Sequence, residues 1–320
     1  MTSAFFLPAA VCSALLWIML RSAASRLPLD VPNARSLHGR PIPRIGGIGV
    51  FAGLAICATA GVIPFAPPLL VAFALAAVSL VDDFSHLPVV LRLAAHFAAA
   101  SFVAWHVLAP MNSIELAFLV VAIAWLTNLF NFMDGSDGLA AGMALIGFGT
   151  YALAAWLAGD GDLAVLCVAI ASASAGFLLY NFPPVSVFLG DAGSVPLGFL
   201  AGAIGISGWR NDLWPLWFPV LVFAPFIGDA TLTLVKRALR RERVWQAHRE
   251  HYYQRLVQMG FGHRGTAAVG YGVMLLCAAA AFYGRNREFT LQTIVLGAAF
   301  VFLGALGAWI DLRWRRHTRP

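Results

Sequence analysis

Long apolar runs recur along almost the whole chain, and they constrain its fold more than any other feature. A membrane-spanning helix needs about 20 mainly apolar residues. Windows close to that size, separated by charged stretches, occur at 4–20, 45–63, 67–81, 93–109, 116–132, 139–158, 163–181, 195–209, 214–235, 267–284 and 291–312. The windows 67–81 and 195–209 are short, so ten spans are an alternative to eleven. The pattern predicts an all-α polytopic membrane protein.

The charge content excludes a soluble protein of ordinary composition. Apolar residues make up 60% of the 320 positions and charged residues only 11%, whereas soluble domains carry roughly 25% charged residues. The longest polar segment, 236–266, is too short for a separate soluble domain. We therefore expect one transmembrane domain over residues 1–320.

Basic residues are divided unevenly between the two ends of the predicted spans. Of the 21 Lys and Arg, only Arg210, Arg285 and Arg287 fall on one side. Lys and Arg accumulate in cytoplasmic loops, so the other side is predicted to be cytoplasmic. This places the N-terminus in the periplasm, the C-terminus in the cytoplasm and the segment 236–266 in a cytoplasmic loop.

Six aspartates fall on this predicted cytoplasmic face, at or near the ends of spans. They are Asp82, Asp83, Asp134, Asp137, Asp191 and Asp229. Carboxylates at a membrane boundary are costly and usually have a partner or a function. Several converging carboxylates repel one another, and Mg2+ relieves this by binding one or two of them together with phosphate oxygens. The pattern indicates a magnesium site, although pairing with neighbouring arginines is an open alternative.

The segment 128–138 carries polar side chains at every third position. On a helix end, Asn128, Asn131 and Asp134 would be neighbours, and Gly135 and Gly138 would let the chain turn sharply. Amides and carboxylates at this spacing suit metal binding or hydrogen bonding to a nucleotide or phosphate. A polar helix cap is the simpler alternative, but it accounts for only one of these residues.

A second motif, Phe188-Leu-Gly-Asp191-Ala-Gly-Ser194, places a carboxylate between glycines just before a predicted span. Backbone amide groups at a helix start can also face an anion. The preceding Pro183-Pro184 predicts an irregular loop, either a binding loop or a plain connector.

Together these motifs resemble the polyprenyl-phosphate N-acetylhexosamine-1-phosphate transferases of glycosyltransferase family 4, relatives of the phospho-MurNAc-pentapeptide translocase. The resemblance rests on Asp82-Asp83, the segments 128–138 and 188–194, and an opening segment from Asp30 to Gly47, in this order along the chain. The opening segment is similar to that of the branch that uses UDP-N-acetylhexosamines for O-antigen, enterobacterial common antigen or teichoic acid linkage units.

The resemblance implies a reaction and its participants. The enzyme would transfer a sugar 1-phosphate from a UDP-sugar to undecaprenyl phosphate and release UMP, with Mg2+, or Mn2+ in its place, as cofactor. The donor would be UDP-GlcNAc or a 6-deoxy sugar such as UDP-FucNAc or UDP-QuiNAc. The product would initiate a cell-surface glycan such as lipopolysaccharide O-antigen. The enzyme is expected in the bacterial inner membrane, with its active site on the cytoplasmic face. A homodimer is an open alternative to a monomer, and no nucleic acid is expected as a partner.

The same resemblance implies roles for individual residues. Asp82 would deprotonate or orient the lipid phosphate, Asp137 would help to hold the uridine, and the histidines would contact the sugar or its phosphate. The full assignment is catalytic Asp82, Asp83, Asp134, His248 and His251; metal-binding Asp191 and Asp134; and substrate-binding His38, Asn128, Asn131, Asp137 and Arg249.

One motif departs from the family pattern. Many relatives carry His-x-His-His in the last large cytoplasmic loop, whereas this chain reads His248-Arg249-Glu250-His251-Tyr252-Tyr253. His248 and His251 stand three apart and would share a helix face, but Tyr252 replaces the third histidine. This form resembles members that use 6-deoxy sugars.

A secondary transporter is the alternative from another class, because polar residues and glycines within spans also mark transport pathways. Transport sites lie near mid-membrane, whereas these acids gather at one face.

Overall fold

A computed structural model describes residues 2–22, 27–32, 37–85, 87–106, 112–244, 246 and 248–318. Within these ranges, nine helical segments are long and apolar enough to cross a membrane. They contain α1 (Thr2–Ser22), α3 (Pro67–Ser85), α4 (Val89–His106), α5 (Ser113–Phe132), α6 (Leu139–Leu157), α7 (Gly161–Asn181), α8 (Asp191–Arg210), α12 (Gly262–Gly284) and α13 (Phe289–His317). The prediction of an all-α polytopic membrane protein is confirmed, while the orientation of its termini stays a prediction.

Two of the eleven predicted spans take a different form. The window 45–63 becomes α2 (Gly46–Thr59), a helix of only 14 residues. The window 214–235 is divided into α9 (Trp217–Val222) and α10 (Ala224–Leu239). Pro225 lies in the first turn of α10, where a missing amide hydrogen costs nothing, so a new helix starts there.

The two windows that are short in the sequence form full-length helices. The helix α3 has 19 residues and α8 has 20. The apolar windows were shorter than the helices because they left out charged residues at the helix ends. The helix α3 continues through Asp82 and Asp83 to Ser85, and α8 begins at Asp191. These acids are therefore part of the spans' end turns rather than of the connecting loops.

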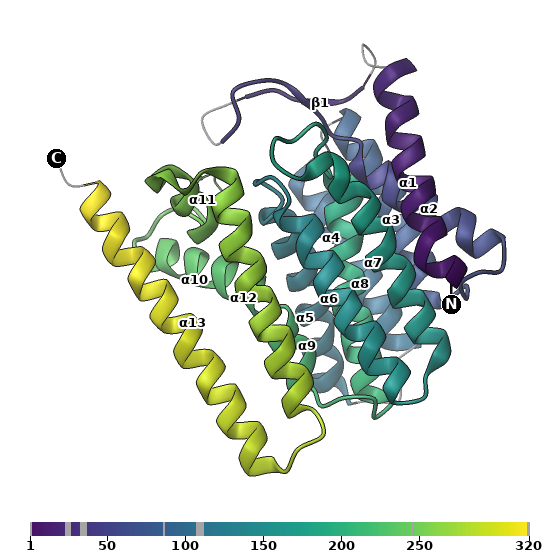
Figure 1. Ribbon diagram of the computed structural model, residues 1–320. Helices are drawn as coiled ribbons and strands as arrows, with labels where there is room; N and C mark the ends of the chain where they lie inside the picture. Colours follow the sequence, from purple (N-terminus) through teal and green to yellow (C-terminus); the bar gives the residue numbers. More distant parts are fainter. Residues whose placement is uncertain are drawn as a thin grey trace.

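Helix α8 lies at the centre of the bundle and α13 at its edge. In the most apolar stretch of α8, 89% of the residues are buried, against 11% in α13. Helices α3 and α5 pack on α8, while α1 and α6 pack on α7. Figure 1 shows α13 at the far side of the molecule from α1, with α12 beside it. The first residue of α8 is thus surrounded by other elements.

The opening segment pairs with the loop that precedes α8. Strands β1 (Leu29–Asp30) and β2 (Ile42–Pro43) form an antiparallel hairpin. The amide of Phe188 donates to the carbonyl of Pro43 at 2.8 Å, and the amide of Gly46 donates to the carbonyl of Phe188 at 2.9 Å. This pairing places the opening segment beside the start of α8. Residues 33–36 of the opening motif lie outside the described residues.

Glycine allows α2 and α8 to approach closely. A Cβ atom built on Gly47 would lie 2.3 Å from the amide nitrogen of Gly193 and 2.4 Å from the carbonyl carbon of Ala192. Small residues permit such backbone contact between membrane helices. The contact lies in the first turn of α8.

The predicted loop 236–266 is partly helical. It contains α11 (Tyr252–Leu256) and a π-helical turn, η2 (Val257–Phe261), and α12 begins at Gly262. Figure 1 shows α11 and the β1 hairpin at the same end of the molecule.

Candidate active site

A polar cavity of about 510 Å3 lies where the ends of α3, α5 and α8 meet the opening segment and the loop before α11. Eight of the residues singled out from the sequence line it, namely His38, Asp82, Asp83, Asn131, Asp134, Asp191, His248 and His251. Residues more than 200 positions apart therefore contribute to one cavity.

Asp191 is the centre of the charge network in this cavity. Its Oδ1 accepts hydrogen bonds from Arg44 Nη2 at 3.1 Å and Asn131 Nδ2 at 2.9 Å. Its Oδ2 accepts from Arg92 Nη1 at 3.3 Å. The amide of Asn131 also contacts Ser194 Oγ at 3.0 Å. Two guanidinium groups thus offset the negative charge of Asp191.

Asp83 holds the start of α8. Its carboxylate accepts from the amides of Asp191 at 3.3 Å and Ala192 at 3.0 Å. Arg44 Nη1 lies 3.6 Å from its Oδ1. A helix N-terminus favours an anion, and here Asp83 is that anion. The anion expected at the backbone amides of this helix start is therefore a carboxylate of the protein itself.

Asp82 faces Arg92 rather than the start of α8. Its Oδ1 accepts from the amide of Leu87 at 2.6 Å, and its Oδ2 lies 3.1 Å from Arg92 Nη1. The same nitrogen contacts Asp191. Arg92 therefore bridges the carboxylates of Asp82 and Asp191. The aspartates gather in one cavity, and some of them also pair with neighbouring arginines, which was the alternative to a metal site.

Asp134 follows the end of α5, which stops at Phe132, so it does not continue the helical spacing expected from Asn128 and Asn131. In the part of the chain that the structure describes, Asp134 forms no ion pair. Burial raises the pKa of Asp134 well above its ordinary value; Arg44 opposes this shift, and the charge of Asp191 adds to it. A cation placed beside Asp134 would lower that pKa again.

These residues fit a hard divalent cation. Among the described residues, no three acids, histidines or cysteines are grouped as a complete metal site. Mg2+ needs only one or two carboxylates, since water and phosphate oxygens complete its shell. Asp191 and Asp134 line the same cavity and repel each other, which is the conflict that a cation relieves. A cation bound to Asp191 would share its carboxylate with Arg44 and Arg92.

His248 and His251 form another part of the cavity wall. Their rings are 4.8 Å apart, and His251 Nδ1 lies 3.1 Å from Asp229 Oδ1. Their proximity does not come from a shared helix, because α11 begins only after His251. The prediction that His248 and His251 share a helix face is therefore wrong. Burial lowers the pKa of His248 to about 4, and the neighbouring His251 adds to the shift, so His248 is neutral at pH 7.

Three residues assigned to substrate stand outside the cavity wall. Asn128 donates to a backbone carbonyl of its own helix at 2.7 Å. Asp137 lies 3.1 Å from His263 Nδ1 and accepts from the amide of Val185 at 3.3 Å. Arg249 is exposed. Asp137 thus ties the loop before α8 to α12, and substrate contacts by these three residues stay predictions.

Tyr252 and Tyr253 face different surroundings. Tyr253 lines the polar cavity. The hydroxyl of Tyr252 contacts Lys236 and lies 3.4 Å from Asp311 Oδ2, which belongs to α13. The side chain of Tyr252, which stands where many relatives have the third histidine, therefore points away from the polar cavity.

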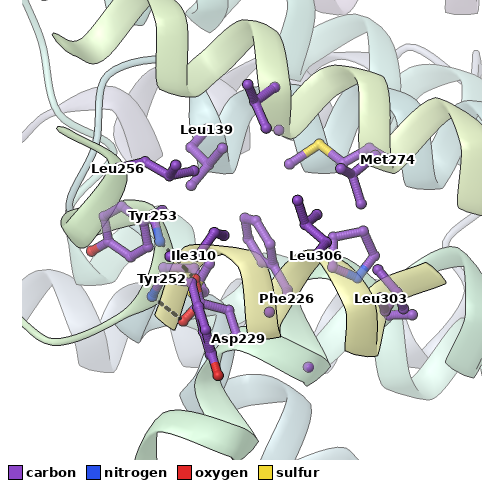
Figure 2. A pocket seen from close by; sticks show the side chains of 18 of the residues that line it. Leu139, Phe226, Asp229, Tyr252, Tyr253, Leu256, Met274, Leu303, Leu306 and Ile310 are labelled. Carbon is purple, nitrogen blue, oxygen red and sulfur yellow. Dashed lines mark hydrogen bonds between the residues drawn. The ribbon is translucent and has the colours of Figure 1, made fainter. Parts of the chain in front are cut away.

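An apolar pocket of about 110 Å3 adjoins the polar cavity between α10, α12 and α13. Figure 2 shows its lining side chains, which include Phe226, Leu256, Met274, Leu303, Leu306 and Ile310. Tyr253 contributes to the walls of both spaces. A polar and an apolar binding surface therefore meet at one residue.

The motifs predicted no particular role for Arg44 and no site role for Asp229. Arg44 belongs to the opening segment, and only the pairing of that segment with residue 188 brings it to Asp191. His38, from the same segment, lies 3.1 Å from Asp30 and packs edge-on against Phe188.

Comparison with known proteins gives the same assignment as the motifs. Residues 65–209 match the model of the glycosyl transferase family 4. The chain is 26% identical over 306 residues to the probable undecaprenyl-phosphate N-acetylglucosaminyl 1-phosphate transferase of Bacillus subtilis (strain 168), covering 89% of this chain and 85% of that protein. It is 29% identical over 337 residues to the decaprenyl-phosphate N-acetylglucosaminephosphotransferase of Mycobacterium tuberculosis (strain CDC 1551 / Oshkosh), covering 88% and 82%.

A more distant branch is similar over a shorter stretch. The phospho-N-acetylmuramoyl-pentapeptide-transferase of Enterococcus hirae is 34% identical over 141 residues, which is 43% of each chain. The family-model match contains Asp82, Asp83, Asn131, Asp134 and Asp191, which are the residues that the structure gathers in the polar cavity. The resemblance inferred from the motifs is therefore confirmed: residues 65–209 match glycosyl transferase family 4, and the chain is similar over most of its length to polyprenyl-phosphate N-acetylglucosamine-1-phosphate transferases.

Proposed function

We propose that this protein transfers a sugar 1-phosphate from a UDP-N-acetylhexosamine to undecaprenyl phosphate with the help of Mg2+. The observation that carries the proposal is the polar cavity, in which five aspartates, two arginines and three histidines line one space near the ends of membrane helices. The curated relatives named above, which act on polyprenyl phosphates, support the same reaction.

The charges of the cavity suit phosphoryl transfer. In this reaction an oxygen of the lipid phosphate attacks the β-phosphorus of the donor, and UMP leaves. Catalysis of such a step depends mainly on positioning and on neutralising phosphate charge. Mg2+ held by Asp191 and Asp134 would polarise the diphosphate. Arg44 and Arg92, which line the same cavity, would bind phosphate oxygens through their guanidinium groups.

Asp82 is placed to act on the lipid phosphate. Its partner Arg92 lies near the start of α4, at the boundary of the predicted membrane, where a lipid headgroup resides. Asp82 would orient that phosphate or remove its proton, and Asp83 would keep the start of α8 in register. Direct attack by the lipid phosphate and a covalent route through an aspartate are both compatible with this arrangement.

The apolar pocket beside the cavity supports a lipid acceptor. An isoprenoid chain requires apolar surface next to the place where its phosphate reacts. The pocket between α10, α12 and α13 offers such a surface, and it shares the lining residue Tyr253 with the polar cavity. We therefore place the acceptor's chain on the bilayer side of the molecule and the nucleotide on the cytoplasmic side.

The histidines are the proposed contacts to the sugar or its phosphate. His248 and His251 line the cavity, and neutral His248 can donate one hydrogen bond and accept another. Arg249 follows them on the exposed surface. We propose UDP-GlcNAc or a 6-deoxy sugar such as UDP-FucNAc or UDP-QuiNAc as the donor, and the initiation of a surface glycan such as O-antigen as the role in the inner membrane.

Tyr252 is not expected to select the sugar, because its side chain faces Lys236 and Asp311 instead of the cavity. Tyr252→His should leave the ratio of kcat/KM between UDP-GlcNAc and UDP-QuiNAc within about twofold. A pocket contact of the expected kind would change it roughly 10- to 200-fold. Competition between the two donors, followed by mass spectrometry of the lipid product, measures the ratio. A change of tenfold or more in this ratio would show that Tyr252 contributes to sugar selection.

The reaction itself is tested with purified protein in detergent. With undecaprenyl phosphate, MgCl2 and a panel of UDP-N-acetylhexosamines, we expect UMP and a polyprenyl-diphosphate sugar in equal amounts. Omitting the lipid or adding EDTA should stop both. Accumulation of a UDP-sugar inside proteoliposomes without UMP release would instead support the transporter alternative and contradict the proposal.

A further inference from the structure

Asp229 makes an unusual number of contacts for an acid whose side chain is only 9% exposed. It lies on α10, and its Oδ1 accepts from the amide of Tyr252 at 2.9 Å and lies 3.1 Å from His251 Nδ1. Its Oδ2 accepts from the amide of Tyr253 at 2.9 Å. Figure 2 shows Asp229 beside the two tyrosines at the start of α11. One carboxylate thus holds both the backbone of α11 and the ring of His251.

The contact with Asp229 determines which ring nitrogen of His251 carries hydrogen. An ionised carboxylate has no hydrogen to donate, so in the contact with Asp229 Oδ1 the ring nitrogen Nδ1 has to be the donor. In the neutral ring the lone pair is then on Nε2, at the opposite side of the ring from Asp229. His251 is 4% exposed and lines the polar cavity.

We propose that Asp229 is a positioning residue that keeps His251 in its Nδ1–H tautomer and presents Nε2 as a hydrogen-bond acceptor or base at the polar cavity. The catalytic consequence rests on the proposed transferase function, whereas the tautomer does not. An acid with this role on a histidine fixes both its orientation and its proton in other enzymes.

A purely structural role is the competing explanation, because Asp229 also caps α11 through the two tyrosine amides. The tautomer of His251 in Asp229→Asn distinguishes the two roles. Oδ1 of Asp229 accepts from the Tyr252 amide and also contacts His251, so an Asn with Nδ2 at that position keeps only the Tyr253 contact; as a donor facing His251, this Nδ2 favours the opposite tautomer, with hydrogen on Nε2. Thr233→Val is the matched control, since it removes the 3.3 Å contact of Thr233 Oγ1 with Asp229 and leaves both histidine nitrogens untouched.

The test is 15N NMR of histidine-labelled protein in detergent micelles, which distinguishes the tautomers by their nitrogen shifts. The signal of His251 is assigned by its loss in His251→Gln. We expect the Nδ1–H tautomer in the wild type and in Thr233→Val, and the Nε2–H tautomer in Asp229→Asn. In the transferase assay, Asp229→Asn should lower kcat/KM for the UDP-sugar roughly 10- to 200-fold, the range for loss of one substrate contact.

The outcomes separate this inference from the function on which it rests. A wild-type His251 in the Nε2–H tautomer overturns the inference even if Asp229→Asn does not fold. An altered tautomer with unchanged kcat/KM for the UDP-sugar overturns the catalytic part of the inference. Absence of wild-type turnover with every UDP-sugar overturns the proposed function, while the tautomer measurement remains decisive for the pairing of Asp229 with His251.

Discussion

Replacing Asp191 with Asn is expected to abolish turnover while leaving expression and membrane insertion unchanged. The amide is isosteric, but it is a poor Mg2+ ligand and cannot form the ion pairs that the carboxylate makes with Arg44 and Arg92. Removing one group that stabilises transition-state charge typically costs about 10²- to 10³-fold in kcat, and loss of the metal adds to this. The start of α8 should persist, because Asp83 rather than Asp191 caps it.

Two measurements test this expectation. The rate of UMP release reports turnover, and electron paramagnetic resonance of added Mn2+ reports metal binding independently of activity. Asp162→Asn is the matched control, since Asp162 is also an acid in the first turn of a helix, α7, but is exposed. Substantial activity or unchanged Mn2+ affinity in Asp191→Asn would remove Asp191 from the metal site.

A single methyl group at Gly47 is expected to disable the enzyme through its architecture. The new Cβ would lie 2.3 Å from the amide nitrogen of Gly193, a distance at which one of the two backbones has to move. Overpacking of this kind typically costs about 1–3 kcal/mol. Because the contact lies two residues beyond Asp191, the displacement also separates Asp191 from Arg44. Gly47→Ala should therefore lower both thermal stability and turnover.

Gly149→Ala is the control for this change. Gly149 lies inside α6, and a Cβ there would meet no other atom within 4 Å. Alanine is the better helix former by about 1 kcal/mol, so this variant should be as stable as the wild type or more so, with unchanged turnover. Thermal melting in detergent and UMP release compare the two. A fully stable, fully active Gly47→Ala protein would show that the approach of α2 to α8 is not needed.

The periodicity of apolar runs, which depends only on local sequence, predicted the class of fold correctly. A helix satisfies its own backbone groups inside a bilayer, so each apolar window can be assigned without knowledge of its neighbours. The broken ninth span was missed because hydrophobicity does not register the effect of Pro225. The gathering of Asp82, Asp83, Asn131, Asp134 and Asp191 was also predictable, since topology places the ends of these spans on one face.

Side-chain direction and contacts between distant segments were decided by the tertiary structure alone. Arg44 contacts Asp191 because the opening segment pairs with the loop before α8. Asp229 contacts His251 although the two residues are more than twenty positions apart. Tyr252 and Tyr253 are adjacent in sequence and both line the apolar pocket, but only Tyr253 also lines the polar cavity. Spacing along a chain describes neighbours on one helix, whereas these contacts depend on how separate elements are packed, and packing is a property of the whole bundle.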